Sequence, residues 1–320
     1  MGGSHLNHKP IADRTLWLWC LLAVSSPLAV TAAENMPLTV AVFGAWILLL
    51  VWVTYSNVQE SLPQWLRILQ WLWMIPVLAE IIGMAANTWP DSTRDPVIPA
   101  SMVLLAMWSA MGGTERTART GTVLAMLAAL LYAMLLFAGI KDIRLEYLSW
   151  RIDAPKGSLL TALLLPALLS YLPGQKNTSS VASLTGILVF SVMIAVLTGG
   201  ILSSQVVRSL PQSFLEMAKG LTLFGTARRF EALTAAVLSM GWFAAISLLL
   251  CVSGALPRSV DDRISKGSIL ATAASALLLW FLKLQFHPHV LAVGSALIWC
   301  FLPIAAASAK KRKKEQKKEK

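Results

Sequence analysis

The sequence has little charge for its length, and this excludes an ordinary soluble domain. Charged residues make up 13% of the 320 residues, hydrophobic residues make up 56%, and the mean hydropathy is +0.65. Soluble domains carry about 25% charged residues. The composition therefore indicates an integral membrane protein.

Cysteine and histidine are also scarce. Cys20, Cys251 and Cys300 lie in apolar runs without paired spacing, so we expect packing residues and no disulfide. The four histidines have no carboxylate or cysteine at ligand spacing, so we expect no metal ion and no cofactor. The apolar runs contain no Ser/His/Asp, Cys/His or paired-carboxylate set, which argues against an enzyme.

Positive charge is concentrated in one place. The stretch Lys310–Lys320 holds eight of the 27 basic residues, and the net charge is +11. A short basic tail directly after an apolar helix is typical of a cytoplasmic anchor facing anionic lipid, so we expect no nucleic-acid partner. The sequence then divides into a cytoplasmic N-terminus (1–14), a transmembrane permease-like domain (15–308) and a basic cytoplasmic tail (309–320).

Hydropathy predicts an all-α polytopic membrane protein with about ten transmembrane helices, because lipid leaves unpaired backbone groups without a partner. The expected segments are 15–33, 38–55, 65–86, 97–112, 121–140, 158–172, 181–206, 230–255, 267–284 and 289–308. The first segment could instead be a removable signal peptide, since residues 30–33 resemble a cleavage site. Of the longer connections, 141–157 and 207–229, the latter could form a short amphipathic helix, either a packed external lid or a plain connector.

Two of the apolar segments contain a proline at corresponding positions. If the ten segments form two sets of five, Pro27 interrupts the first segment of one set and Pro166 the first segment of the other. This pattern predicts a 5+5 inverted-repeat (LeuT-like) transporter fold with broken first and sixth helices, whose freed backbone groups bind a small molecule. The alternative is that each proline only kinks its helix.

Two further stretches resemble a known family. Residues 113–120 read Gly-Thr-Glu-Arg-Thr-Ala-Arg-Thr before a long apolar helix, and residues 228–233 read Arg-Arg-Phe-Glu-Ala-Leu. With ten spans and a Lys-rich end, they resemble the B subunits of bacterial spore germinant receptors, permease-like members of the amino acid–polyamine–organocation superfamily. The stretch 113–120 is similar to that family's Gly-x-Glu-x-x-x-Arg loop before the fifth helix. The stretch 228–233 is similar to its Arg-x-Glu-Ala-Leu start of the eighth helix.

The chain also departs from that family. Leu238 and Ala245 stand where the family usually has Trp and Lys, and Trp242 comes one turn late. Ser25-Ser26-Pro27 replaces a Gly-rich break.

The resemblance implies a ligand site between the two broken helices and against the third and eighth. Glu80, an acid inside an apolar segment, is a candidate proton or amine partner, or else a packing residue. The expected ligand-binding residues are Ser25, Ser26, Pro27, Thr31, Glu80, Leu165, Pro166, Ala167, Ser239 and Trp242. With few fixed charges, such a pocket should favour a small zwitterion or an uncharged ligand.

The expected function is that of a germinant-receptor subunit in the inner membrane of a spore. It would bind a germinant, expected to be an amino acid, and signal to a large membrane subunit and a lipoprotein within the bilayer. The alternative is a secondary amino-acid permease of the same fold, and an ion-conducting or purely structural subunit comes third.

Overall fold

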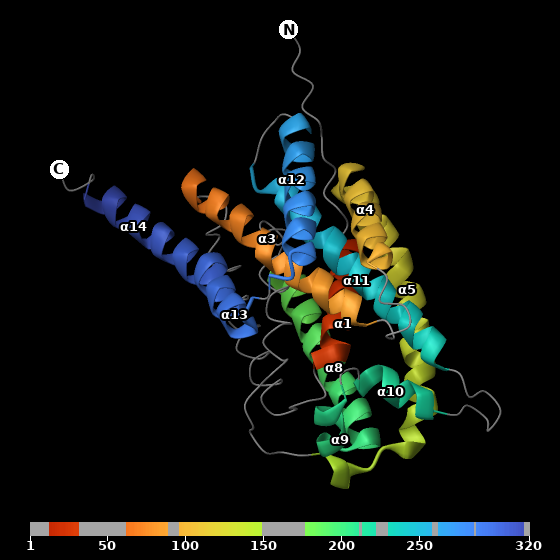
Figure 1. Cartoon of the computed structure of the whole chain (residues 1–320). Coiled ribbons are helices and arrows are strands. Elements are labelled where there is room, and N and C mark those ends of the chain that lie inside the picture. The colour runs from red at the N-terminus through yellow and green to blue at the C-terminus, as the bar shows by residue number, and fades with distance from the viewer. Residues whose placement is uncertain are drawn as a thin grey trace.

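The computed structural model describes residues 13–31, 62–88, 96–148, 177–210, 213–221, 230–257, 262–284 and 286–316, and its regular elements there are helices. Figure 1 shows their arrangement. They are α1 (Asp13–Thr31), α3 (Gln64–Asn87), α4 (Val97–Met111), α5 (Thr114–Gly139), η4 (Ile140–Asp142), η5 (Leu145–Tyr147), α8 (Asn177–Leu202), α9 (Ser204–Ser209), α10 (Ser213–Gly220), α11 (Phe230–Ala255), α12 (Asp262–Phe281), α13 (Pro288–Ala296), η6 (Leu297–Phe301) and α14 (Leu302–Gln316).

Several helix boundaries follow directly from local sequence. Pro63 and Pro96 are the N-caps of α3 and α4, and Pro288 begins α13, where a missing N–H carries no penalty. Gly113, with φ of +101°, lets the chain turn sharply from α4 into α5. At the end of α12 the N–H of Leu284 donates to Leu279 and that of Lys283 to Trp280, a Schellman motif.

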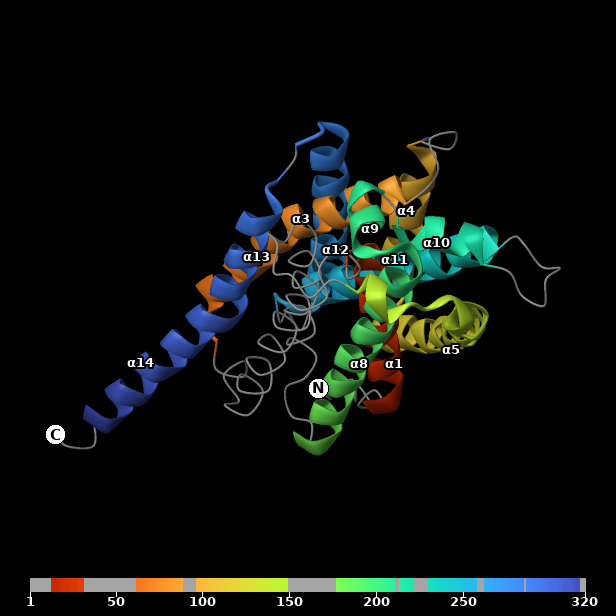
Figure 2. The same ribbon diagram turned by 90° about the horizontal axis from the view of Figure 1, so that it is seen from below.

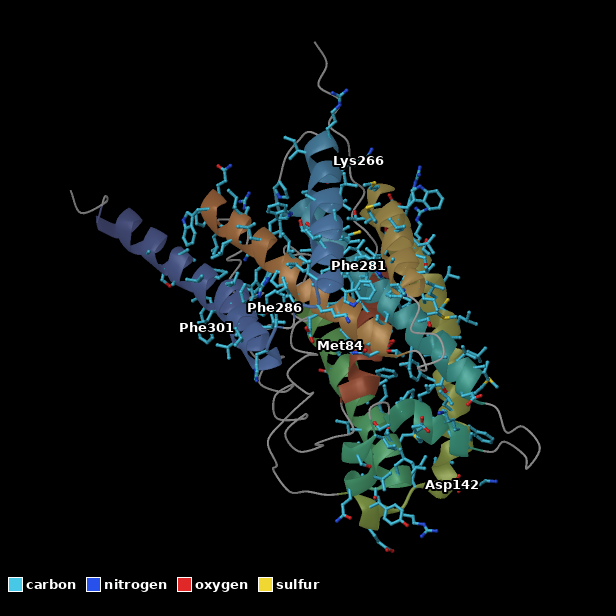
Figure 3. The ribbon with its side chains drawn as sticks, viewed as in Figure 1. Met84, Asp142, Lys266, Phe281, Phe286 and Phe301 are labelled. Atoms are coloured by element: carbon cyan, nitrogen blue, oxygen red, sulfur yellow. The ribbon has the colours of Figure 1, made fainter. Side chains whose placement is uncertain are left out.

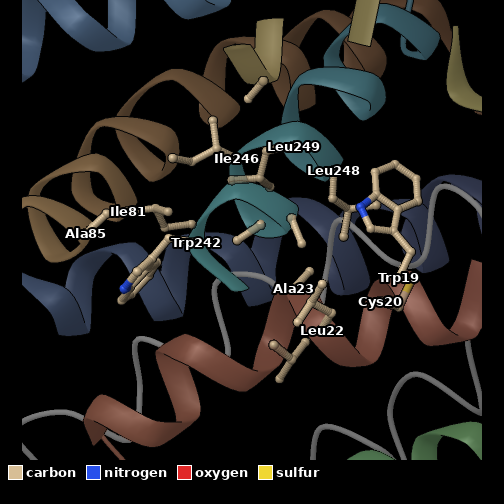
Figure 4. Close-up of a cluster of buried hydrophobic side chains, with 14 of the residues drawn as sticks. Trp19, Cys20, Leu22, Ala23, Ile81, Ala85, Trp242, Ile246, Leu248 and Leu249 are labelled. Carbon is tan, nitrogen blue, oxygen red and sulfur yellow. The ribbon is translucent and has the colours of Figure 1, made fainter. Parts of the chain in front are cut away.

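Helix α11 is the central element of the bundle. It packs against α1, α3, α4, α5, α10 and α12. Of the residues in its most apolar stretch 72% are buried, whereas the corresponding share in α5 is 33%. Figure 4 shows part of its core, where Trp242, Ile246 and Leu249 of α11 lie with Ile81 and Ala85 of α3. The hydrophobic core is therefore built around α11.

Within the described residues, four helices are long and apolar enough to cross a membrane: Gln64–Asn87, Thr114–Asp142, Glu231–Ala255 and Arg263–Phe281. Shorter apolar helices cover Thr15–Pro27, Val97–Met111, Val192–Leu202 and Val293–Ala309. Lys266 and Asp142 lie towards opposite ends of the bundle, with Phe281 and Met84 between them (Figure 3). Charge at the ends and apolar side chains between them fit a helical membrane protein.

The expected segments agree with these helices in position. Eight of the ten, all but 38–55 and 158–172, fall wholly or mostly on described residues, and each of the eight is mainly helical there. The other two lie outside the described residues. A total of ten spans, the inverted repeat and the orientation therefore stay predictions.

The expected amphipathic helix in the connection 207–229 is confirmed. Helix α10 buries Phe214, Leu215, Met217 and Ala218 against its neighbours, which include α8 and α11, and exposes the ion-paired Glu216 and Lys219. It is thus packed onto the bundle and is not a bare connector.

The last helix differs from the others in shape. The segment α13–η6–α14 lies beside α3 and then extends away from the bundle, as the two views in Figures 1 and 2 show. Between α13 and α14, η6 is a π-helical turn in which the N–H of Leu302 bonds to the carbonyl of Leu297, five residues earlier.

Candidate functional site

The first helix is not broken at its proline. Helix α1 runs without interruption from Asp13 to Thr31 with Pro27 inside it, so the expected break at this position is wrong. A proline removes one helical hydrogen bond and crowds one carbonyl, but the loss is local. The residues just before it, Val24, Ser25 and Ser26, are fully buried, and this packing holds the helix together.

The two serines beside Pro27 lie in a tight seam between α1 and α11. The hydroxyl of Ser26 donates to the carbonyl of Leu238 on α11 at 2.7 Å, and that of Ser25 donates to Leu22 in its own helix at 2.7 Å. A Cβ added to Gly241 would lie 2.0 Å from the Ser26 hydroxyl oxygen and 2.9 Å from that of Ser25. Glycine at 241 is therefore what lets the two helices approach.

A buried hydroxyl next to this seam is not fully satisfied. Tyr132 of α5 is packed edge-on against Phe190 of α8, at 5.0 Å between ring centroids, and at 6.1 Å from Phe214 of α10. Its hydroxyl has a loose contact with Ser25 but no hydrogen bond of regular geometry with a described residue. A buried donor that is not fully satisfied is unusual in native structures, so this hydroxyl can take a further hydrogen-bond partner.

Trp242 joins α11 to the end of α3. Its ring is fully buried, and its Nε1 donates to Thr88 Oγ1 at 2.9 Å, while the Thr88 hydroxyl donates to the Met84 carbonyl at 3.0 Å. Ser239, one turn before Trp242, donates to Ala235 in its own helix at 2.6 Å. Both residues are thus engaged in helix contacts.

Glu80 stands apart from these residues. It is partly buried on α3, inside an apolar helix, and makes no hydrogen bond or ion pair with any residue that the structure describes. Its neighbour Ile81 packs towards Trp242 (Figure 4), so the carboxyl group is directed to another face of α3. Glu80 is therefore not joined to Ser25 or Ser26 within the described part of the chain.

The remaining site predictions lie outside what the structure describes. Thr31 ends α1, but its side chain is not among the described ones. Leu165, Pro166 and Ala167 lie wholly outside the described residues, so the second expected break stays a prediction.

The two motifs that carry the family resemblance begin helices. Gly113 is the N-cap of α5, Glu115 lies in its first turn, and Arg119 pairs with Glu115 on the surface. Glu231 lies exposed in the first turn of α11. An acid in the first turn is stabilised by the helix dipole, so the motif residues that are described have a clear structural role.

The sequence interpretation missed three residues of this region: Tyr132, Gly241 and Thr88. Tyr132 had one available signal, because a tyrosine in the middle of an apolar span brings a hydroxyl that needs a partner. Gly241 and Thr88 matter only through contacts with α1 and Trp242, which no local pattern predicts.

Among the described residues, no group of three or more His, Cys, Asp or Glu side chains could hold a metal ion. No protein-family model matches the chain. The search of curated proteins likewise found no match.

Proposed function

We propose that this chain is a permease-like membrane subunit of a spore germinant receptor, which binds a small amino acid or similar zwitterion and signals to partner subunits. The proposal is supported by the order and spacing of the motifs at 113–120 and 228–233, with the helical membrane character of the chain. The partners would be a large membrane subunit and a lipoprotein in the inner spore membrane.

The observation that carries the ligand site is the incompletely satisfied hydroxyl of Tyr132. It lies beside Ser25, next to a seam where α1 and α11 are held by Ser26. The Tyr132 hydroxyl offers a donor to a carboxylate, the Ser25 hydroxyl can add a second only by giving up its bond to Leu22, and the surrounding rings and helices exclude water. The proposed ligand site is therefore centred on the junction of α1, α5 and α11 and not on the proline.

A ligand held there could signal only by favouring one arrangement of these helices over another. The junction suits this role, because α1 and α11 touch closely and Phe214 of α10 packs against Tyr132. A ligand that separates α1 from α11 would shift α11, which contacts most of the other helices.

The test is Tyr132→Phe, which removes only the hydroxyl. A hydrogen bond to a charged group contributes about 1.5–3 kcal/mol, so spores carrying the variant should need roughly 10- to 100-fold more amino acid to germinate. The amount of protein in the membrane should not change. Tyr147→Phe is the matched control, because its hydroxyl meets only the exposed Arg144.

Deletion of the chain separates the candidate functions. Loss of germination with unchanged uptake of labelled amino acid supports the receptor. Loss of uptake with normal germination would instead support the amino-acid permease. Unchanged germination and uptake would contradict both.

A further inference from the structure

The π turn in the last helix has a visible cause in the sequence. Pro303 lies two residues after it and is buried in the first turn of α14. In a regular α-helix its ring would crowd the carbonyl of Trp299, four residues earlier. A wider turn at Leu297–Phe301 moves that carbonyl away from the ring.

The π turn changes the partner of one carbonyl. In a regular helix the N–H of Leu302 would bond to the carbonyl of Ile298, four residues earlier. Here it bonds to Leu297, and the Ile298 carbonyl instead accepts from Nε2 of Gln70 on α3 at 3.4 Å. Gln70 is therefore the donor to the Ile298 carbonyl in the π turn, and Leu302 would be its donor in an α-helical turn.

The contact with α3 is imperfectly matched. Gln70 is fully buried, yet its Oε1 has no donor among the described residues. One turn along α3, Trp73 Nε1 donates to the Ser295 hydroxyl at 3.0 Å, and a Cβ on Gly294 would lie 2.2 Å from the Trp73 ring. The Trp73 contact fixes α13 tightly, whereas the long Gln70 bond holds the π turn weakly.

From this geometry we propose that η6 is a two-state hinge. In one state Gln70 holds the Ile298 carbonyl and the turn is π-helical. In the other, Leu302 takes that carbonyl, the turn becomes α-helical and Gln70 is released. The Trp73 contact keeps α13 in place in both states, so the change is transmitted towards α14.

The consequence falls on the basic end of the chain. A π turn holds one more residue than an α turn, so the change from π to α alters the phase of the following helix by about 100° and its position along the axis by about 1.5 Å. Helix α14 would rotate by that angle, and the basic stretch that begins at Lys310 would turn with it. The hinge thus sets which face of that stretch meets the membrane surface, and it does not depend on the proposed germinant role.

The test measures the distance between α3 and α14 by pulsed electron paramagnetic resonance. Spin labels are placed on cysteines introduced at Ile68 and Ser308, both exposed, while the native cysteines are buried. Gln70→Met removes the donating N–H and keeps the side-chain length, and Pro303→Ala removes the steric cause. The double variant should shift the distance distribution by several ångströms, and each single variant should shift part of the population.

The matched control is Pro27→Ala, which removes a proline from a helix that has no π turn. It should leave the α3–α14 distance unchanged. The proposal is overturned if the double variant gives the wild-type distribution, or if Pro27→Ala shifts it equally. Gln70→Met alone, a mild change, keeps the test valid if the double variant fails to fold.

Discussion

Two helix–helix interfaces of this molecule are packed by different kinds of side chain. The seam between α1 and α11 is close and built from small residues, with the Ser26 hydroxyl bonded directly to the facing backbone. The seam between α3 and the last helix is bridged by the long side chains of Gln70 and Trp73. The first leaves no slack between backbones, whereas the second leaves a buried oxygen unmatched. The difference separates a closely packed interface from a junction that can change register.

The largest expected effect is at Gly241. Gly241→Ala places a methyl group 2.0 Å from the Ser26 oxygen and should destabilise the protein by about 3 kcal/mol, since overpacking moves whole helices. Thermal unfolding in detergent measures it. Gly186→Ala is the control, because nothing lies within 4 Å of its added Cβ. Equal effects of the two variants would show that the seam is not tight.

A second comparison separates hydrogen bonds between helices from those within one. Ser26→Ala removes the bond to Leu238 on α11 and should cost about 1 kcal/mol, near the middle of the range found between membrane helices. Ser25→Ala removes only a bond within α1 and should cost clearly less. Denaturation of both variants measures this, and a larger effect of Ser25→Ala would contradict the assignment.

The other seam can be tested with a double-mutant cycle. Trp73→Phe and Ser295→Ala each remove one end of the bond between α3 and α13, and their coupling should be about 0.5–1 kcal/mol. The pair Trp242→Phe and Thr88→Val, which probes the bond between α11 and α3, is a matched cycle. Additive effects in the first cycle would mean that Trp73 does not fix α13.

The smallest effect has the opposite sign and concerns the chain leading into α13. Lys283 has φ of +53° at the C′ position of the Schellman motif that ends α12. Lys283→Gly should stabilise the protein by about 0.5–1 kcal/mol, because glycine adopts this conformation without strain. Lys266→Gly, inside α12, should destabilise by a similar amount. Stabilisation by both would exclude a conformational origin.

Hydropathy predicted the position of the long apolar helices among the described residues, because lipid and buried core both require apolar runs with paired backbone groups. Proline was a poorer guide. Pro27 was expected to break its helix and does not, whereas Pro303, for which nothing was predicted, lies two residues after a π turn. The outcome of a proline depends on the contacts that its helix makes with a neighbouring helix. Packing of Ser26 and its buried neighbours against α11 keeps α1 regular, whereas Gln70 on α3 donates to the Ile298 carbonyl in place of the helix backbone.

The contacts of the candidate site residues could be predicted only in part for the same reason. Ser25 and Ser26 were selected beside Pro27, and Trp242 from the family resemblance, and all three lie where helices meet. Their hydrogen-bond partners on neighbouring helices are distant in sequence: Ser26 donates to Leu238, and Trp242 donates to Thr88. Gly241 and Tyr132 belong to the same region, but their importance arises from distances that no single-sequence pattern encodes.

Helix α5 has a further consequence, for how this sequence can evolve. Its outward face exposes Val123, Met126, Leu130, Met134 and Phe137. If that face meets hydrocarbon, selection there acts only on apolarity, and one such residue can replace another by neutral drift. Helix α11 is enclosed on most sides, so each of its positions is constrained in volume as well. Two descendants of this gene should therefore lose their resemblance along α5 long before they lose it along α11.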